Sequence, residues 1–142
     1  MTKEVELSIS GLHTEAGEEN AGVETVAFGE YYKKNGSHYL FYQEALEGLE
    51  KPVRTRIMFE QGRLELVRQG GISTRMVFEK NKKHPAQYHT PYGKFLMGID
   101  TKEICVEETQ DCIQVTVDYR LEAEEQYLSD SSIVIRIRGR ET

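Results

Sequence analysis

The sequence predicts an all-β protein built as a single antiparallel up-and-down β-barrel of about nine or ten strands. Three observations lead to this fold class. Val, Ile, Thr, Tyr and Phe together number 42 of the 142 residues, whereas Ala occurs only 6 times, a composition that favours strands over helices. Apolar and polar residues alternate with a period of two along most of the chain. Tight-turn signals separate the alternating runs, so that consecutive strands are expected to be antiparallel neighbours.

Length and composition indicate one domain that covers residues 1–142. A mass of 16.3 kDa and a 38% share of hydrophobic residues suffice for one core and not for two. The sequence has no apolar stretch of the length needed to cross a bilayer, and the start Met1–Glu6 is too charged for a secretory signal. Two cysteines argue against a disulfide scaffold and fit a reducing, cytoplasmic location.

The first expected strand covers residues 4–10, where Val5, Leu7 and Ile9 alternate with polar residues. The polar stretch 13–22 follows as a surface connection. Closing the meander into a barrel would pair this first strand with the last one and remove both exposed edges. A two-sheet sandwich is the alternative, but such folds usually need longer crossovers than this chain offers.

The next strands form two predicted hairpins with two-residue loops. Asn35-Gly36 tolerates the positive φ angles of a type I′ turn, and such a loop pairs Tyr32 with Tyr39 and Glu30 with Phe41. A loop at Gln61-Gly62 brings apolar residues together on both strands, which a wrong register would not do. The pairs in this second hairpin are Phe59 with Leu64, Ile57 with Leu66, and Thr55 with Arg68.

Two further turns continue the meander. A three-residue loop at 69–71, with a glycine at positive φ, would pair Leu66 with Thr74 and Leu64 with Met76. Thr90-Pro91-Tyr92-Gly93 is a type I turn signal. The alternating runs 113–121 and 133–137 supply the closing strands.

Several of these segments resemble a bacterial family of unknown function, the YwiB-like proteins. The matching segments are Gly29–Lys33, Tyr39–Glu44, Gly62–Gly70, Met76–Phe78 and Tyr88–Gly93. The resemblance runs from the first strand to the last and depends on the order and spacing of the segments. It implies a calycin-like β-barrel, the architecture of lipocalins and intracellular fatty-acid binders, and it implies no established activity.

Charge is distributed unevenly along the chain. Residues 1–50 carry 3 Lys and Arg against 10 Asp and Glu, residues 51–94 carry 10 against 3, and residues 95–142 carry 5 against 11. The basic middle third would suit an anion-binding face, or its charges would pair across the sheet with acidic neighbours. Nucleic-acid binding would use the cations Arg54, Arg56, Arg75, Lys80, Lys82 and Lys83 with Tyr42 or Tyr88 for stacking. The net charge of −6 argues against it, and pairing across the sheet is favoured.

The sequence contains no motif that indicates catalysis, a cofactor or a metal. A nucleophile elbow and a phosphate-binding glycine motif are absent. The spacings of His84 with His89 and of Cys105 with Cys112 match no zinc pattern. Cys105 and Cys112 are expected on the outward face of adjacent strands as reduced thiols.

The expected barrel interior is mostly aromatic, with polar residues among the apolar ones. The phase of the alternation directs Phe28, Tyr32, Tyr39, Phe41, Ile57, Phe59, Leu64, Leu66, Met76, Phe78, Val115, Val117 and Tyr119 inward. Five polar residues share that phase: Glu30, Gln43, Thr55, Arg68 and Thr74. Arg68 must be paired, hydrated or at the barrel mouth, and Glu30 is its expected internal partner.

These positions lead to two hypotheses. In the first, a cytoplasmic barrel binds a small, largely apolar or amphipathic molecule whose anionic or polar head meets Arg68, Tyr119, Gln43, Glu30, Thr55, Thr74, Tyr32 and Tyr39. In the second, the same side chains fill the core, and a non-enzymatic barrel acts through its locally basic outer surface on a partner protein. Neither hypothesis requires a cofactor, a membrane or a nucleic acid.

Overall fold

The computed structural model of the protein describes residues 4–11, 24–44, 50–70, 73–90, 93–123 and 126–139. Within these ranges the chain forms ten strands and no helix. The strands are β1 (Glu4–Ser10), β2 (Glu24–Lys34), β3 (Ser37–Glu44), β4 (Val53–Glu60), β5 (Arg63–Gln69), β6 (Ser73–Glu79), β7 (Lys83–Thr90), β8 (Gly93–Glu108), β9 (Cys112–Ala123) and β10 (Gln126–Gly139).

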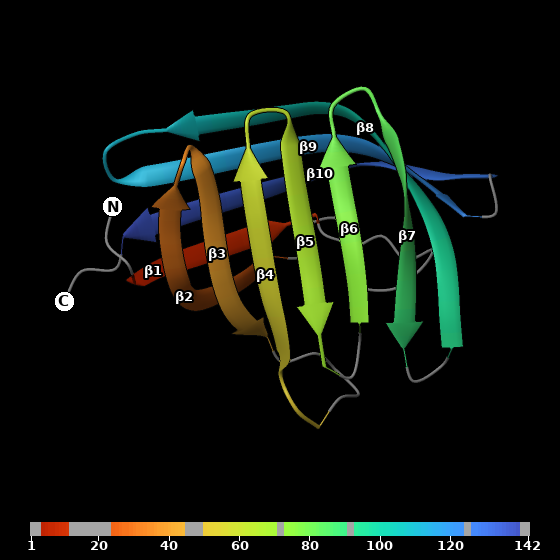
Figure 1. Ribbon diagram of the computed structural model, residues 1–142, viewed down its shortest axis with the longest axis horizontal. Helices are drawn as coiled ribbons and strands as arrows, with labels where there is room; N and C mark the ends of the chain where they lie inside the picture. Colours follow the sequence, from red (N-terminus) through yellow and green to blue (C-terminus); the bar gives the residue numbers. More distant parts are fainter. Residues whose placement is uncertain are drawn as a thin grey trace.

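The ten strands form a closed antiparallel barrel in which each strand pairs with its neighbours in sequence and β1 pairs with β10. The predicted up-and-down barrel is therefore confirmed. The barrel is flattened into two layers: β2 to β7 stand upright in the front layer, while β1, β9 and β10 cross behind them (Figure 1). No described segment is a helix long and apolar enough to span a membrane.

Strand β2 joins the two layers by changing partners near Gly29. Its first half pairs with β1 up to Glu30, and its second half pairs with β3 from Gly29 onward. A Cβ atom at Gly29 would lie 2.4 Å from the carbonyl oxygen of Phe41 and 3.0 Å from Cβ of Tyr42. Glycine is therefore the residue that allows β3 to approach β2 this closely.

Both predicted two-residue hairpins are confirmed. Asn35 and Gly36 have φ angles of 52° and 83°, and Tyr32 lies opposite Tyr39. Gly62 also has a positive φ of 83°, and Thr55 lies opposite Arg68.

The register predicted for the next hairpin is wrong by two residues. Leu66 pairs with Met76 and Arg68 with Thr74, because β5 continues through Gln69 before the chain turns. Gly70 has the expected positive φ, at 148°. In the later turn, Thr90 pairs with Gly93 as expected, while residues 91 and 92 lie outside the described residues.

The core is continuous through the interior. Most of the residues predicted to point inward do so, including Ile57, Leu66, Phe78 and Val117, and the side chains of Phe78 and Tyr119 are in edge-on contact at 5.1 Å between ring centroids. Buried aromatic and aliphatic side chains from all ten strands thus contribute to one core.

The inward phase predicted for β2 and β3 is reversed. The side chains that point into the core are Tyr31, His38, Leu40, Tyr42 and Glu44, whereas Phe28, Glu30, Tyr32, Phe41 and Gln43 are exposed and Tyr39 is half-buried. The hairpin register holds in either orientation, since each residue keeps its cross-strand partner when the whole hairpin is turned over. Small Gly29 and Ala27 face inward in place of Phe28 and Glu30.

One joint of the barrel is weaker than the others. β6 and β7 pair only at Ser73 with His89 and at Thr74 with Tyr88. The hydroxyl of Thr74 adds a hydrogen bond to the carbonyl oxygen of Gln87 at 3.0 Å. In contrast, β1 and β10 pair from Val5–Gly139 to Ser10–Val134. The first and last strands are therefore paired over more residues than β6 and β7.

Candidate binding site

Arg68 is buried in the barrel and forms an ion pair with Glu44. Its Nε donates a hydrogen bond to Oε1 of Glu44 at 3.1 Å, and its Nη2 lies 3.1 Å from the same oxygen. The hydroxyl of Thr55 donates a further hydrogen bond to that oxygen, also at 3.1 Å. The prediction that Glu30 is the partner of Arg68 is wrong, because Glu30 points outward and accepts a hydrogen bond from Tyr32.

Polar side chains extend from Arg68 across four neighbouring strands. Tyr42 lies opposite Thr55, Thr55 opposite Arg68, and Arg68 opposite Thr74. We call these four residues the buried polar row. Burial, and then the charge of Glu44, raise the pKa of Tyr42 despite the opposing effects of Arg68 and Thr55, so its hydroxyl keeps its proton at neutral pH.

The buried polar row has spare hydrogen-bond donors. Although Nη2 of Arg68 is close to Glu44, neither Nη1 nor Nη2 makes a hydrogen bond of good geometry with the described residues, and the same holds for the hydroxyl of Tyr42. Buried groups of this kind usually meet an ordered water or a ligand. Glu44 already balances the charge of Arg68, so these donors require an acceptor oxygen and not another negative charge.

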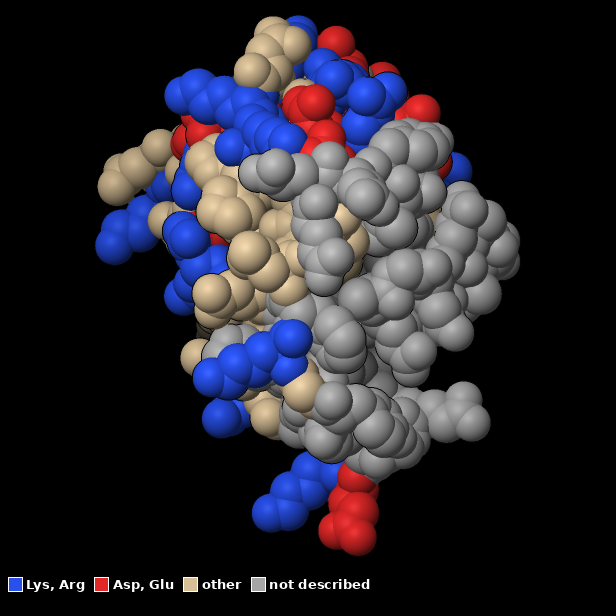
Figure 2. Space-filling model, turned by 90° about the vertical axis from the view of Figure 1, so that its right-hand side faces the viewer, with Lys and Arg blue, Asp and Glu red and all other residues tan. Residues whose placement is uncertain are grey.

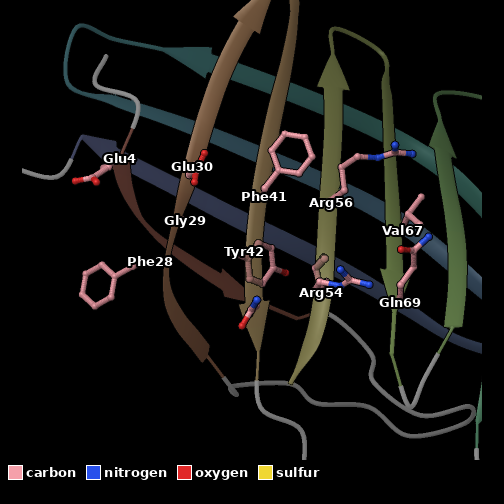
Figure 3. Close-up of a pocket in the computed structure, with 12 residues that line it drawn as sticks. Glu4, Phe28, Gly29, Glu30, Phe41, Tyr42, Arg54, Arg56, Val67 and Gln69 are labelled. Carbon is pink, nitrogen blue, oxygen red and sulfur yellow. The ribbon is translucent and has the colours of Figure 1, made fainter. Parts of the chain in front are cut away.

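A second site lies on the outer face of the front layer. A pocket of about 690 Å³ extends from β1 to β5; Figure 3 shows Phe28, Phe41, Arg54 and Arg56 on neighbouring strands in it. We call it the outer pocket. Its lining residues are Glu4, Phe28, Gly29, Glu30, Phe41, Tyr42, Gln43, Arg54, Thr55, Arg56, Val67 and Gln69.

The sheet register places the lining residues of the outer pocket in two parallel rows. One row runs across four strands and consists of Glu30, Phe41, Arg56 and Val67; it continues to Arg75 on β6, outside the lining of the pocket. In the other row, Gln43 lies opposite Arg54, which lies opposite Gln69. Phe28 is 56% and Phe41 41% exposed, so the pocket has an aromatic side on β2 and β3 and a basic side on β4.

The arginines of the basic side differ in their pairing. Arg56 and Arg75 both contact Glu65, at 3.2 and 2.6 Å, and Arg63 lies 3.5 Å from it. Burial tends to raise the pKa of Glu65, but the hydrogen bond from Arg75 and the charges of the three arginines outweigh it, so that the pKa is lowered. Arg54 has no ion-pair partner among the residues that the structure describes.

The expected pairing of basic and acidic strands is confirmed at two places. Lys80 contacts Glu103 at 3.0 Å and Lys83 pairs with Glu122, whereas Lys82 contacts Glu79 of its own basic segment at 3.1 Å. On the side of the molecule near β7 and β8, blue and red side chains mix at the top, and blue ones line the left-hand margin, which belongs to the front layer (Figure 2). On this side of the molecule, blue side chains without red neighbours therefore lie toward the front layer.

A single histidine, His38, packs among aromatic side chains on the inward face of the β2–β3 hairpin. The hydroxyl of Tyr31 is 2.7 Å from Nδ1 of His38, and the ring of His38 stacks on Phe59 with centroids 4.6 Å apart. Nε2 of His38 lies 3.9 Å from Glu108. Burial lowers the pKa of His38, partly offset by Glu108, and burial with the charge of Glu108 raises the pKa of Tyr31 to about 12.

The eight residues predicted for a ligand site are thus divided between two faces of the sheet. Arg68, Thr55, Thr74 and Tyr119 point into the core as expected, whereas Glu30, Gln43, Tyr32 and Tyr39 are on the outer side. Of the eight, Glu30, Gln43 and Thr55 contribute to the outer pocket. Phe28 and Phe41 were expected inside, and Glu44 was not recognised, because its phase depends on the orientation of the hairpin.

The cysteines and metal-binding residue types form no cluster within the described part of the chain. Cys105 and Cys112 are both free, and Cys105 lies opposite Thr116 on the neighbouring strand. No group of three or more His, Cys, Asp or Glu side chains is arranged to hold a metal ion among the described residues. The side chain of His89 lies outside the described residues.

The fold and the outer pocket define a closed ten-stranded antiparallel barrel with a site of ligand size on its outer face. The chain belongs to the family described as a domain of unknown function, DUF1934, whose model matches residues 7–135. This confirms the expected relation to a family without an assigned role.

A solved structure supports the same fold. The crystal structure of the ywiB protein from Bacillus subtilis is 18% identical in sequence and superposes with a TM-score of 0.79, covering 98% of this chain and 93% of that one. At this identity the likeness establishes the architecture alone. No curated protein matches the chain.

Proposed function

We propose that the protein is a binding module that holds a small ligand with an aromatic or apolar body and an anionic head in the outer pocket. The observation that carries this proposal is the outer pocket itself, where exposed Phe28 and Phe41 lie beside Arg54 and Arg56. A volume of about 690 Å³ is in the range of small-molecule sites. The exposed rings would be covered by the apolar body, and Arg54 would receive the anion.

The ligand proposed here has the chemistry expected from the sequence, but its site lies in the outer pocket and not inside the barrel. Calycin-like barrels would hold such a molecule inside, but here the corresponding inward positions are packed by Ile57, Phe59 and their neighbours. The two free thiols fit the cytoplasmic compartment that we propose for the protein.

The probe 8-anilinonaphthalene-1-sulfonate tests the proposal, because it combines an aromatic body with an anionic sulfonate. We expect its fluorescence to rise on binding, with Phe41→Ser weakening binding by about 1–2 kcal/mol through lost apolar contact. Arg54→Gln should weaken binding more at low salt than at high salt.

Matched controls are available away from the pocket. Leu96 is 60% exposed on β8, and Arg136 is exposed on β10, where its Nε contacts Gln114. Leu96→Ser and Arg136→Gln should leave binding of the probe unchanged. Equal effects of the pocket and control variants would show that the probe does not select the outer pocket.

A second candidate site is the buried polar row, favoured by the spare donors on Arg68 and Tyr42. An interior ligand there would present a neutral carbonyl or hydroxyl oxygen, because Glu44 already balances Arg68. Native mass spectrometry of the purified protein tests this candidate. A bound molecule that is retained by the parent and by Phe41→Ser but lost from Arg68→Met would place the ligand inside the barrel.

A further inference from the structure

We propose that the outer pocket and the adjoining arginines bind single-stranded nucleic acid. The inference rests on the proposed function and specifies its ligand, because a nucleotide is an aromatic body with an anionic head. In this arrangement, bases stack on Phe28 and Phe41, and phosphates contact Arg54, Arg56 and Arg75.

The two phenylalanines offer two separate exposed rings for stacking, 56% and 41% exposed. Phe41 lies opposite Glu30 in the β2–β3 ladder, whereas Phe28 precedes the point where β2 leaves β3 and lies opposite Glu6 of β1. In Figure 3 the ring of Phe28 points away from that of Phe41, so each ring would take a different base. Base stacking on aromatic side chains tolerates any sequence and is the usual source of affinity for single strands.

The arginines continue the same rows toward the basic side. Arg56 lies directly opposite Phe41, and Arg75 is reached on the same row across Val67. The side chains of Arg56 and Arg75 are 49% and 61% exposed. Both are held by Glu65, which presents them in a fixed arrangement without cancelling their combined charge.

Polar and acidic residues at the margins fit this orientation of the strand. Gln43 and Gln69 lie on either side of Arg54 in the second row, and their amides can both donate to and accept from base edges. Glu4 and Glu30 lie opposite each other at the far margin, where they would repel phosphates. The backbone is therefore expected over β4 to β6 and the bases toward β2 and β3.

The net charge of −6 disfavours binding of a polyanion by the molecule as a whole. The structure concentrates Arg54, Arg56, Arg63 and Arg75 on the front layer, with Glu65 as the shared acidic partner of the last three. The local positive charge and the exposed rings then favour binding of the nucleic acid, and the acidic remainder of the molecule weakens that binding. The expected result is modest affinity with a clear dependence on salt.

Fluorescence anisotropy with a labelled oligouridylate of about 12 nucleotides tests this inference. Three arginine–phosphate contacts predict a slope of about −2 for log K against log salt concentration. Phe28→Ser and Phe41→Ser should each weaken binding by between about 5-fold and about 100-fold. Arg54→Gln should reduce the magnitude of the slope by about 0.7, whereas Leu96→Ser and Arg136→Gln should change neither quantity.

Three outcomes would overturn the inference. The first is no binding of the oligouridylate by a protein that binds the anilinonaphthalene probe in the outer pocket, a result that leaves the proposed function intact. The second is equal affinity for a duplex of the same length, because paired bases are not available for stacking. The third is binding that competes with an acidic peptide and does not respond to Phe28→Ser or Phe41→Ser, which would indicate a purely electrostatic protein partner.

Discussion

Arg68 illustrates how a single buried charge constrains the barrel. Its side chain is fully inaccessible to solvent, while that of Glu44 is 6% exposed. A guanidinium cannot lose its proton to escape burial, so the fold depends on the carboxylate of Glu44 to compensate it.

Removing that compensation should be costly. Glu44→Gln leaves the charge of Arg68 unpaired and should lower the free energy of unfolding by about 3–5 kcal/mol, measured by urea denaturation. The double variant Arg68→Met/Glu44→Gln should recover most of the loss, because no unpaired charge remains. A double variant as unstable as Glu44→Gln would show that packing of the arginine stem, and not its charge, is what matters.

Gly29 offers a second test at the residue scale. Gly29→Ala places Cβ 2.4 Å from the carbonyl oxygen of Phe41, so β2 and β3 must move apart. We expect a loss of about 1–3 kcal/mol in unfolding free energy. Gly98→Ala is the matched control, because the nearest atom to its Cβ would be the flexible Cε of Lys83 at 3.2 Å; its effect should stay within about 0.5 kcal/mol.

His38 should make stability depend on pH. Its pKa is lowered in the folded protein by burial, so the unfolded chain binds more protons in the window just below its ordinary pKa of 6.5. Stability should therefore decrease as the pH falls through that window. His38→Gln should flatten this part of the profile in denaturation experiments. An unchanged slope in His38→Gln would assign the dependence to other groups.

At the scale of the elements, hairpins and alternating strands were predictable, whereas the orientation of one hairpin was not. Asn35-Gly36 determines that Tyr32 pairs with Tyr39, and this prediction is confirmed. Both faces of the hairpin carry aromatic residues, since Tyr31 and Tyr42 alternate with Phe28, Tyr32 and Phe41. Local alternation therefore cannot select the inward face, which is decided by the close approach at Gly29 and by packing against β1.

The candidate site was less predictable than the fold for the same reason. Once the hairpin is turned over, Glu44 enters the core beside Arg68, and two phenylalanines move to the outer face. Arg54, Arg56 and Arg75 were recognised as candidate cations, but their position beside Phe28 and Phe41 follows only from the correct orientation of β2 and β3.

The joint between β6 and β7 predicts uneven hydrogen exchange. Beyond Thr74, the β6 amides that point toward β7 lack the ladder bonds present at the other joints. We expect these amides to exchange fastest among the strand interiors, and those of the continuous β9–β10 ladder to exchange among the slowest. The measurement is exchange monitored by NMR. Uniform protection around the whole barrel would contradict this prediction.

For the whole molecule, the side chains that form the core and most of those that carry the charge lie on opposite faces of the sheet. The core is formed by inward-facing side chains from all ten strands, and the basic middle of the sequence supplies the outer face of the front layer. Lys80–Glu103, at 3.0 Å, and Lys83–Glu122 link the basic and acidic parts of the sequence. A basic surface can therefore exist on an acidic protein without weakening its core.

The unequal joints of the barrel also bear on how its sequence can be rearranged. Val5 lies opposite Gly139, so a peptide linker could join β1 to β10, while the turn at Asn81 (φ 64°) follows the weakly paired edge of β6. A circular permutant that begins at Lys82 and ends at Asn81 would keep the complete β1–β10 ladder and would break the chain beside β6 and β7, at the cost of the backbone hydrogen bonds from Asn81 to Thr101 and from Lys82 to Glu79. A barrel of this kind can therefore be opened beside β6 and β7, near the middle of the sequence, while the ladder between β1 and β10 stays whole.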